Sequence, residues 1–325
     1  MIVPIEMQTT RPMRLSAGDM STTTRVWDVL MASRAGNLAR FQDLTARQEG
    51  LLYAQYNYTP PIYFAVRGGH IDLVSFLLAH GALDPDYKTY PFLDTLPTFA
   101  TERGFSEVGD MLDEYLSDPA GHRCRGDNGE IEYGRTPPEA DFERNVNAGD
   151  VDAVRRMLAE QPELVHDETY NWGEGILLFA AKSGNWPMLD LLIGHGARVP
   201  KISKWARFYY FERTDSAAYL LDHGMDPDHM SWHRVTLLHD MAHANDLEKA
   251  ELLVRHEANI DAVDDEYLST PLGFAARWGN ADMVQYLIDN GADTDRSGAP
   301  WSRPIEWAKS GGHDEIVGIL SENLA

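Results

Sequence analysis

The feature that most constrains this chain is a short sequence unit that recurs along it. The clearest copy runs from Thr270 to Asp293, and a second copy with the same internal spacing runs from Pro61 to Ala82. A unit of this length can form a pair of helices but cannot bury its own apolar face, so its copies must stack on one another. The recurrence therefore predicts a helical stack whose core grows with each added unit.

The residues of the clearest copy suit successive places in a helix-turn-helix. Thr270 is a helix N-cap residue, and Pro271 follows at the first helical position, where its missing N–H costs nothing. Ala275 and Ala276 are small enough to let two helices approach closely. Gly279 can adopt the left-handed conformation that turns the chain into the next helix.

This unit resembles the ankyrin consensus, in which Thr-Pro-Leu-His opens a short helix, Gly-His leads into a second helix and Gly-Ala-Asp closes the unit. Further copies contain Thr236-Leu237-Leu238-His239, Ala180-Ala181 with Gly196-Ala197, and Gly312-His313, and weaker copies begin near Arg25, Thr95, Ala140 and Lys204. We therefore predict an all-α ankyrin-repeat solenoid of about nine helix-turn-helix repeats, some degenerate, with short finger loops and one inserted loop.

The repeats divide the chain into four segments. Residues 1–24 are expected to form a flexible tail, residues 25–116 the first three repeats, and residues 139–325 the fourth to ninth. Residues 117–138 are rich in Gly, Pro, Asp and Asn without helical periodicity, which indicates an insertion or linker. We expect one continuous solenoid with a protruding loop; two separate domains of three and six repeats are the alternative.

Charge and composition narrow the classes of partner. The 325 residues include 51 acidic and 28 basic side chains, a formal net charge of -23. Such a surface repels phosphate backbones and anionic lipid headgroups, so neither nucleic acid nor a membrane is expected as a partner. The single cysteine, Cys124, excludes an intrachain disulfide and a zinc site built from several cysteines. No apolar run reaches the ~20 residues that a membrane-spanning helix needs. We expect the protein to be a cytoplasmic monomer without a cofactor.

Aromatic residues gather where the resemblance places the finger loops. A longer duplication pairs Tyr56-Asn57-Tyr58 with Tyr170-Asn171-Trp172, and fingers of this family generally carry Asp, Asn and Gly instead. The aromatic residues expected there are Tyr56, Tyr58, Tyr87, Tyr90, Trp172, Trp205, Trp232, Tyr267 and Trp301. Tyr and Trp offer rigid contact area with a polar group, which suits recognition of a peptide, ring or sugar. The alternative is that each ring packs against the next finger.

A second row falls near the ends of the first helices of the repeats. Its members are Arg34, Arg67, Arg103, Lys182, Tyr210, His243 and Arg277. In an acidic protein this row favours a carboxylate, a phosphate or an acidic peptide, unless its cations pair with neighbouring acids. The predicted binding residues are Tyr56, Tyr58, Arg67, Tyr87, Tyr90, Arg103, Asn171, Trp172, Lys182, Trp205, Tyr210, Trp232, His243, Tyr267 and Trp278.

The signals for catalysis are weak. His239 and His243 are spaced four apart on one helical face, which can hold a metal, but His239 occupies the consensus histidine position, whose family role is a hydrogen bond between repeats. The acids Asp94, Glu174, Asp240, Glu266 and Glu306 suit glycoside hydrolysis only if two of them pair. No phosphate loop or nucleophile elbow is present, so neither a catalytic nor a metal-binding residue is assigned.

The resemblance implies protein partners on the concave surface, contacted by the fingers and the first helices. The primary expectation is thus a module for protein–protein interaction, with an unknown partner. The alternative is a receptor or enzyme for a sugar, an organic acid or another anionic ligand with its site in the concave face. A self-assembling structural role is a third possibility.

Overall fold

The computed structural model describes residues 1–119, 121–124 and 128–323, in two compact units. Unit 1 comprises Met1–Ile5 and Arg135–Ala325, and unit 2 comprises Glu6–Gly134. Part of the predicted insertion, residues 120 and 125–127, lies outside the described residues. Ser117 ends the last helix of unit 2, Pro137 begins the first helix of unit 1, and the described residues between them contain one short strand.

Unit 2 contains three successive helix pairs. They are α1 (Thr23–Arg34) with α2 (Leu38–Arg47), α3 (Pro61–Arg67) with α4 (Ile71–Ala79), and α5 (Leu96–Glu102) with α6 (Ser106–Ser117). A short 3-10 helix, η2 (Glu49–Tyr53), follows α2. The first helices α1, α3 and α5 pack in sequence, and α4 packs on α6, so the repeats stack as the sequence predicts.

The first residues of the chain correct the expectation of a flexible tail over 1–24. Residues Ile5–Met7 form a 3-10 helix, η1, and two strands follow, β1 (Pro12–Arg14) and β2 (Met20–Thr22). Together with β3 (Glu130–Ile131) they form a three-stranded antiparallel sheet in the order β2-β1-β3. Met13, in the central strand, is fully buried. From Glu6 to the start of α1 the segment is therefore paired and packed within unit 2, whereas Met1–Ile5 belong to unit 1.

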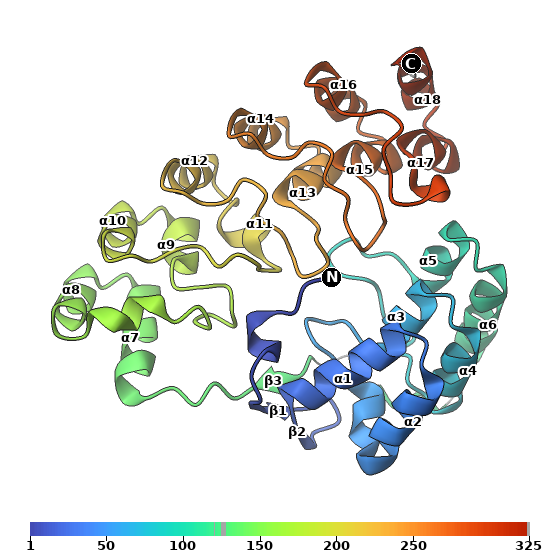
Figure 1. Cartoon of the computed structure of the whole chain (residues 1–325), viewed down its shortest axis with the longest axis horizontal. Helices are drawn as coiled ribbons and strands as arrows, with labels where there is room; N and C mark the ends of the chain where they lie inside the picture. Colours follow the sequence, from blue (N-terminus) through green and yellow to red (C-terminus); the bar gives the residue numbers. More distant parts are fainter. Residues whose placement is uncertain (120, 125–127, 324–325) are drawn as a thin grey trace. The chain divides into compact units, whose positions relative to one another are not determined.

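Unit 1 contains six helix pairs in two layers (Figure 1). The first helices are α7 (Pro137–Ala148), α9 (Leu178–Ser183), α11 (Ala206–Tyr209), α13 (Leu237–Ala244), α15 (Pro271–Arg277) and α17 (Pro304–Ser310). The second helices are α8 (Val151–Glu160), α10 (Trp186–Gly194), α12 (Thr214–Asp222), α14 (Leu247–Arg255), α16 (Ala281–Asp289) and α18 (Asp314–Asn323). Two 3-10 helices, η3 (Pro162–His166) and η4 (Pro300–Ser302), lie in the connections. The predicted all-α class is confirmed, with the small sheet of unit 2 as an addition.

The local signals in the repeats act as predicted. The Thr270 side chain accepts a hydrogen bond from the Gly273 N–H at 3.2 Å at the start of α15, and Gly279 turns the chain at a φ of 76°. The consensus histidine His239 links neighbouring repeats, because its Nε2 donates to the Ser269 carbonyl at 3.1 Å. Among the described residues, no helix has the length and apolar character needed to cross a bilayer.

Candidate binding site

The duplicated motif of the sequence places two successive residues at positive φ in each unit. Asn57 and Tyr58 have φ values of 48° and 58°, and Asn171 and Trp172 have φ values of 51° and 59°. In unit 2, Tyr56 and Thr59 close the turn with two backbone hydrogen bonds, of 3.0 and 3.3 Å. Two successive residues with positive φ define a turn that usually contains Asn and Gly. Here the second position carries a tyrosine or a tryptophan instead.

Positive φ is unfavourable for a large side chain, because Cβ approaches the carbonyl oxygen. A residue held in this region costs about 1–3 kcal/mol and persists only where its surroundings fix it. Trp172 is nevertheless 64% exposed and Tyr58 is 44% exposed, so burial of their rings does not compensate for the strain. The compensation must come from the contacts that hold the turn.

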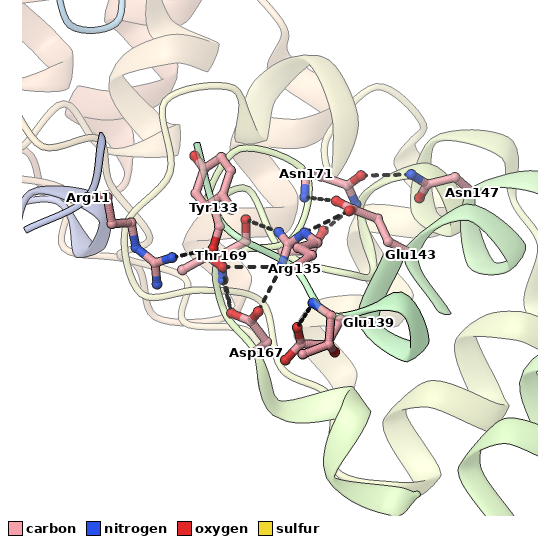
Figure 2. Close-up of polar contacts among 11 residues, drawn as sticks. Arg11, Tyr133, Arg135, Glu139, Glu143, Asn147, Asp167, Thr169 and Asn171 are labelled. Atoms are coloured by element: carbon pink, nitrogen blue, oxygen red, sulfur yellow. Dashed lines mark hydrogen bonds and ion pairs between the residues drawn. The ribbon is translucent and has the colours of Figure 1, made fainter. Parts of the chain in front are cut away.

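Hydrogen bonds from α7 hold the Asn171–Trp172 turn (Figure 2). Glu143 Oε1 accepts the backbone N–H of Asn171 at 2.7 Å, and the Asn147 amide donates to Asn171 Oδ1 at 2.9 Å. Asn171 in turn donates from Nδ2 to the Gly175 carbonyl at 2.9 Å. The Asn171 side chain is 3% exposed, so it positions the turn and offers little surface to a ligand.

Arg135 joins this turn to the loop before it, as Figure 2 shows. Its guanidinium contacts Glu143 at 2.9 Å and Asp167 at 2.8 Å, and donates to the Thr169 carbonyl at 2.8 Å. It also lies 4.4 Å from the ring centroid of Tyr170. Burial alone would raise the pKa of Asp167, but hydrogen bonds from Thr169 and the charge of Arg135 outweigh it and lower that pKa. These contacts therefore fix the position of the turn that presents Trp172.

The matching turn of unit 2 carries a pair of tyrosines. The Tyr58 N–H donates to Asn128 Oδ1 at 3.0 Å, and the Tyr58 ring lies 6.2 Å from the ring of Tyr90. Tyr90 is half-buried, and the nearby Leu93 is 59% exposed at a φ of 62°. Each unit thus presents exposed apolar side chains on left-handed loop residues.

Several predicted binding residues are buried, which corrects the prediction that their side chains face a ligand. The buried ones are Tyr56, Arg103, Asn171, Tyr210, Trp232 and Tyr267, each no more than 7% exposed. The partly or fully exposed ones are Tyr58, Arg67, Tyr87, Tyr90, Trp172, Lys182, Trp205, His243 and Trp278. The buried set is packed within the units.

Specific contacts explain these buried positions. The Tyr210 hydroxyl donates to the Glu174 carbonyl, and the Tyr56 hydroxyl donates to Glu6 at 3.3 Å. The guanidinium of Arg103 lies 3.3 Å from the ring centroid of Phe99 and donates to the Phe99 carbonyl. For Tyr210, Tyr56 and Arg103, burial is thus accompanied by a partner for the polar end.

The basic row of unit 1 comprises Lys182, His243 and Arg277, and its side chains lie against aromatic rings. Lys182 Nζ lies 4.8 Å from the ring centroid of Tyr209, and the Arg277 guanidinium lies 4.4 Å from that of Trp278. The His243 ring meets Trp278 edge to face at 4.5 Å. Arg207, which the sequence analysis missed, donates to His243 Nδ1 at 3.1 Å. It escaped notice because it does not occupy the repeat position shared by the others.

Ionisable groups cluster beside this row in unit 1. Glu174 accepts the backbone N–H groups of Lys204 and Trp205 at 2.9 and 3.1 Å. Burial lowers the pKa of the Lys204 ammonium, against the opposing charges of Glu266 and Glu174. Burial also raises the pKa of Asp240 to about 7, against the charge of Arg207. At each of these groups, burial makes the charge costly unless it is paired.

The histidine pair His239 and His243 does not form a metal site. Both ring nitrogens of His239 are engaged, Nδ1 with the Thr236 hydroxyl at 2.7 Å and Nε2 with the Ser269 carbonyl. Burial lowers the pKa of His239 to about 4. Within the described ranges, no group of three or more His, Cys, Asp or Glu side chains is placed to hold a metal.

Comparisons with known families match the repeats directly. A model of the ankyrin repeat matches residues 58–90, which include α3 and α4. A model of three ankyrin repeats matches residues 205–298 and, overlapping them, residues 238–324, which include the helices from α11 to α18. No curated protein matches the chain. The turn that carries Trp172 lies outside the matched residues.

Proposed function

Because the chain is an ankyrin repeat protein, and ankyrin repeats generally act as protein–protein interaction modules, we propose that it binds a protein partner with Trp172 as an anchor of the contact. The observation that carries this proposal is the combination of exposure and fixation at Trp172. Its side chain is 64% exposed, and its backbone stands at a φ of 59° on a turn held by Glu143 and Asn147.

This arrangement is costly for the isolated protein. A largely exposed indole on a strained backbone contributes little burial to the fold, so the stability of the fold would gain from glycine at that position. A partner that covers the ring recovers the burial of a large apolar surface, and tryptophan is among the side chains that most often dominate a binding interface. Because the turn is already fixed, little conformational entropy is lost when the partner binds.

Tyr58 is the counterpart of Trp172 in unit 2. It occupies the same position of the duplicated turn, is 44% exposed, and lies beside Tyr90. We therefore propose that each unit contributes one exposed aromatic side chain to binding, Trp172 in unit 1 and Tyr58 in unit 2. We call these two side chains the aromatic tips.

Selection of peptides from a random phage-displayed library on the full chain tests the proposal. Peptides enriched on the unaltered protein are then titrated against Trp172→Ala and Tyr58→Ala variants. We expect at least one variant to weaken binding of the selected peptides by about tenfold or more. Trp186→Ala is the matched control, because Trp186 begins α10 in the second-helix layer and contacts Tyr219 there.

One result would contradict the role of the aromatic tips. If selected peptides bind both tip variants as tightly as the unaltered protein, while Trp186→Ala weakens them, the contact lies elsewhere and the aromatic tips are not anchors. A thermal melt of each variant shows whether a loss of binding reflects a loss of folding.

A small-molecule receptor in unit 1 is the second candidate. It is favoured by the buried carboxylates Glu174 and Glu266 around Lys204, whose pKa burial lowers. Thermal-shift screening against sugars and organic acids tests it, because a ligand that binds the native state raises the melting temperature. A shift that Lys204→Met abolishes supports a receptor; no shift with either class of ligand rejects it.

A further inference from the structure

We propose that two finger loops of unit 1, residues 230–236 before α13 and residues 261–269 before α15, bind the amino end of an extended peptide, and that the first residues of this chain occupy the site. The groups recognised are a free α-ammonium and the backbone N–H of the second residue. The inference goes beyond the proposed function, because it assigns a ligand class to loops that contain neither aromatic tip.

The start of the chain supplies the contacts that define this site. Met1–Ile5 belong to unit 1, and Figure 1 marks the start of the chain beside the loop that precedes α13. The Met1 ammonium donates to Asp265 Oδ2, and the Ile2 N–H donates to the Trp232 carbonyl at 2.9 Å. The Met1 side chain is 1% exposed. The segment therefore binds as a peptide ligand does, through its terminal charge and a backbone hydrogen bond.

The carboxylate of Asp265 depends on this ammonium. Its side chain is only 17% exposed, and the Met1 ammonium is its only ion-pair partner among the described residues. A mostly buried carboxylate without a cation is costly, because its lost hydration is not replaced. An ammonium in the site replaces that hydration with a charge-assisted hydrogen bond. The carboxylate therefore sets the charge of the ligand.

Hydrogen bonds within unit 1 hold the two loops in place. The first loop is closed by a bond from the Ser231 N–H to the Val235 carbonyl at 2.9 Å. The Asp265 N–H donates to the His233 carbonyl at 2.8 Å and so joins the second loop to the first. Because these bonds fix the acceptors without help from the ligand, little entropy is lost in the loops when a peptide binds.

The acceptors belong to the loops, so a peptide from another molecule can make the same contacts. Such a peptide competes with Met1–Ile5 for the Asp265 carboxylate and the Trp232 carbonyl. The ligand class is an extended peptide with a free α-amino group and an apolar first side chain like that of Met1. A peptide with an acetylated amine lacks the charge that Asp265 requires.

Fluorescence anisotropy provides the test, on the full chain extended before Met1 by a Gly-Ser linker that moves the terminal ammonium away from Asp265. The first probe is the peptide Met-Ile-Val-Pro-Ile with a fluorophore at its carboxyl end, and the second is the same peptide with an acetylated amine. A formal net charge of -23 attracts any cation, so a third probe is acetylated and carries a lysine before the fluorophore. We expect the first probe to bind about tenfold more tightly than either acetylated probe.

Variants of the extended chain assign this preference to the site. Asp265→Asn keeps the size of the side chain but not its charge, and should remove the preference. Asp282→Asn is the matched control, because it removes an exposed carboxylate of α16 in the second-helix layer, and should leave the preference unchanged. A thermal melt of each variant measures its folding. If Asp265→Asn does not fold, the three probes on the unsubstituted extended chain still decide whether an α-ammonium is recognised.

Occupation by the start of the chain itself is tested without the linker. The protein is one whose first residue, Met1, is confirmed by intact mass. The free-amine probe should bind it at least about tenfold more weakly than the extended chain, because a tethered segment competes at a high effective concentration. Equal binding of the probe to the two chains would overturn this occupation.

Two further results would overturn the site itself. One is equal binding of the free-amine probe and either acetylated probe to the extended chain. The other is a preference that Asp265→Asn retains, which would place the recognition of the ammonium elsewhere.

The test also separates this inference from the proposed function. Library-selected peptides that lose affinity for Trp172→Ala, together with a free-amine probe that shows no preference, would reject this inference and leave the proposed function intact. A preference that Asp265→Asn removes and Trp172→Ala retains would support this inference, whether or not the aromatic tips anchor a partner.

Discussion

Glu143 on α7 accepts the backbone N–H of Asn171 at 2.7 Å, and through this bond the helix fixes a loop residue whose φ is 51°. The second oxygen of the same carboxylate contacts Arg135 at 2.9 Å. One side chain therefore couples the first helix of unit 1, the loop that enters it and the turn that presents Trp172.

This coupling predicts that Glu143→Ala destabilises unit 1. The substitution leaves the Asn171 N–H without its acceptor and Arg135 without one of its carboxylates, and Arg135 is only 12% exposed. We expect the free energy of unfolding to fall by about 2 kcal/mol, the usual cost of removing a charged acceptor from a partly buried site. Urea denaturation measures it. Asp141→Ala, which removes an exposed partner of Arg144, should change it by less than about 0.5 kcal/mol.

The strain at Trp172 predicts an unusual order of stability among its variants. Alanine removes the exposed ring but keeps Cβ at a φ of 59°, whereas glycine removes the strain as well. Trp172→Gly should therefore be more stable than Trp172→Ala by about 1 kcal/mol. Denaturant titrations of the two variants test this order. A less stable glycine variant would mean that the turn is not strained in solution.

The sequence predicted the repeats because their signals are local. Thr270 caps α15 and His239 bonds to the next repeat, as the consensus residues around them indicate. The duplicated Tyr56 and Tyr170 blocks were also recognisable as equivalent. That equivalence did not reveal the left-handed conformation of Tyr58 and Trp172, because propensity assigns it to glycine and asparagine.

What the sequence missed depends on contacts between distant residues. The strand Pro12–Arg14 pairs with Glu130–Ile131, more than a hundred residues away, and no local pattern in the first segment predicts that pairing. Arg135 lies in a segment rich in Gly and Pro, which favoured a linker over a structural role. Trp232 and Tyr267 occupy finger loops in the sequence, but the direction of a loop side chain is set by the neighbouring repeat, and both are buried.

Asp240 predicts a stability that depends on pH. Its pKa is about 7 in the folded chain and near 3.8 when exposed, so the folded chain holds a proton that the unfolded chain releases. The contribution of protonated Asp240 to the free energy of unfolding is complete below about pH 4 and is lost as the pH rises through 7. Asp240→Asn should therefore be about 2 kcal/mol more stable than the unaltered protein at pH 8, a value reduced from the full shift because the side chain is partly exposed. The two proteins should differ little at pH 4; a constant difference between pH 4 and 8 would contradict the raised pKa.

The buried histidines predict that the stability falls as the pH falls, which is opposite to the effect of Asp240. Burial lowers the pKa of His229 and of His239 to about 4, from an ordinary value of 6.5. Below pH 6.5 the unfolded chain takes up protons that the folded chain refuses, so stability falls as the pH falls toward 4, by up to about 3 kcal/mol for each histidine. Denaturation in the Asp240→Asn background removes the opposing titration of Asp240. NMR titration of the ring protons assigns it: both rings should remain neutral at pH 5.5, and a ring that titrates near 6.5 would show that it is solvated and not held between the repeats.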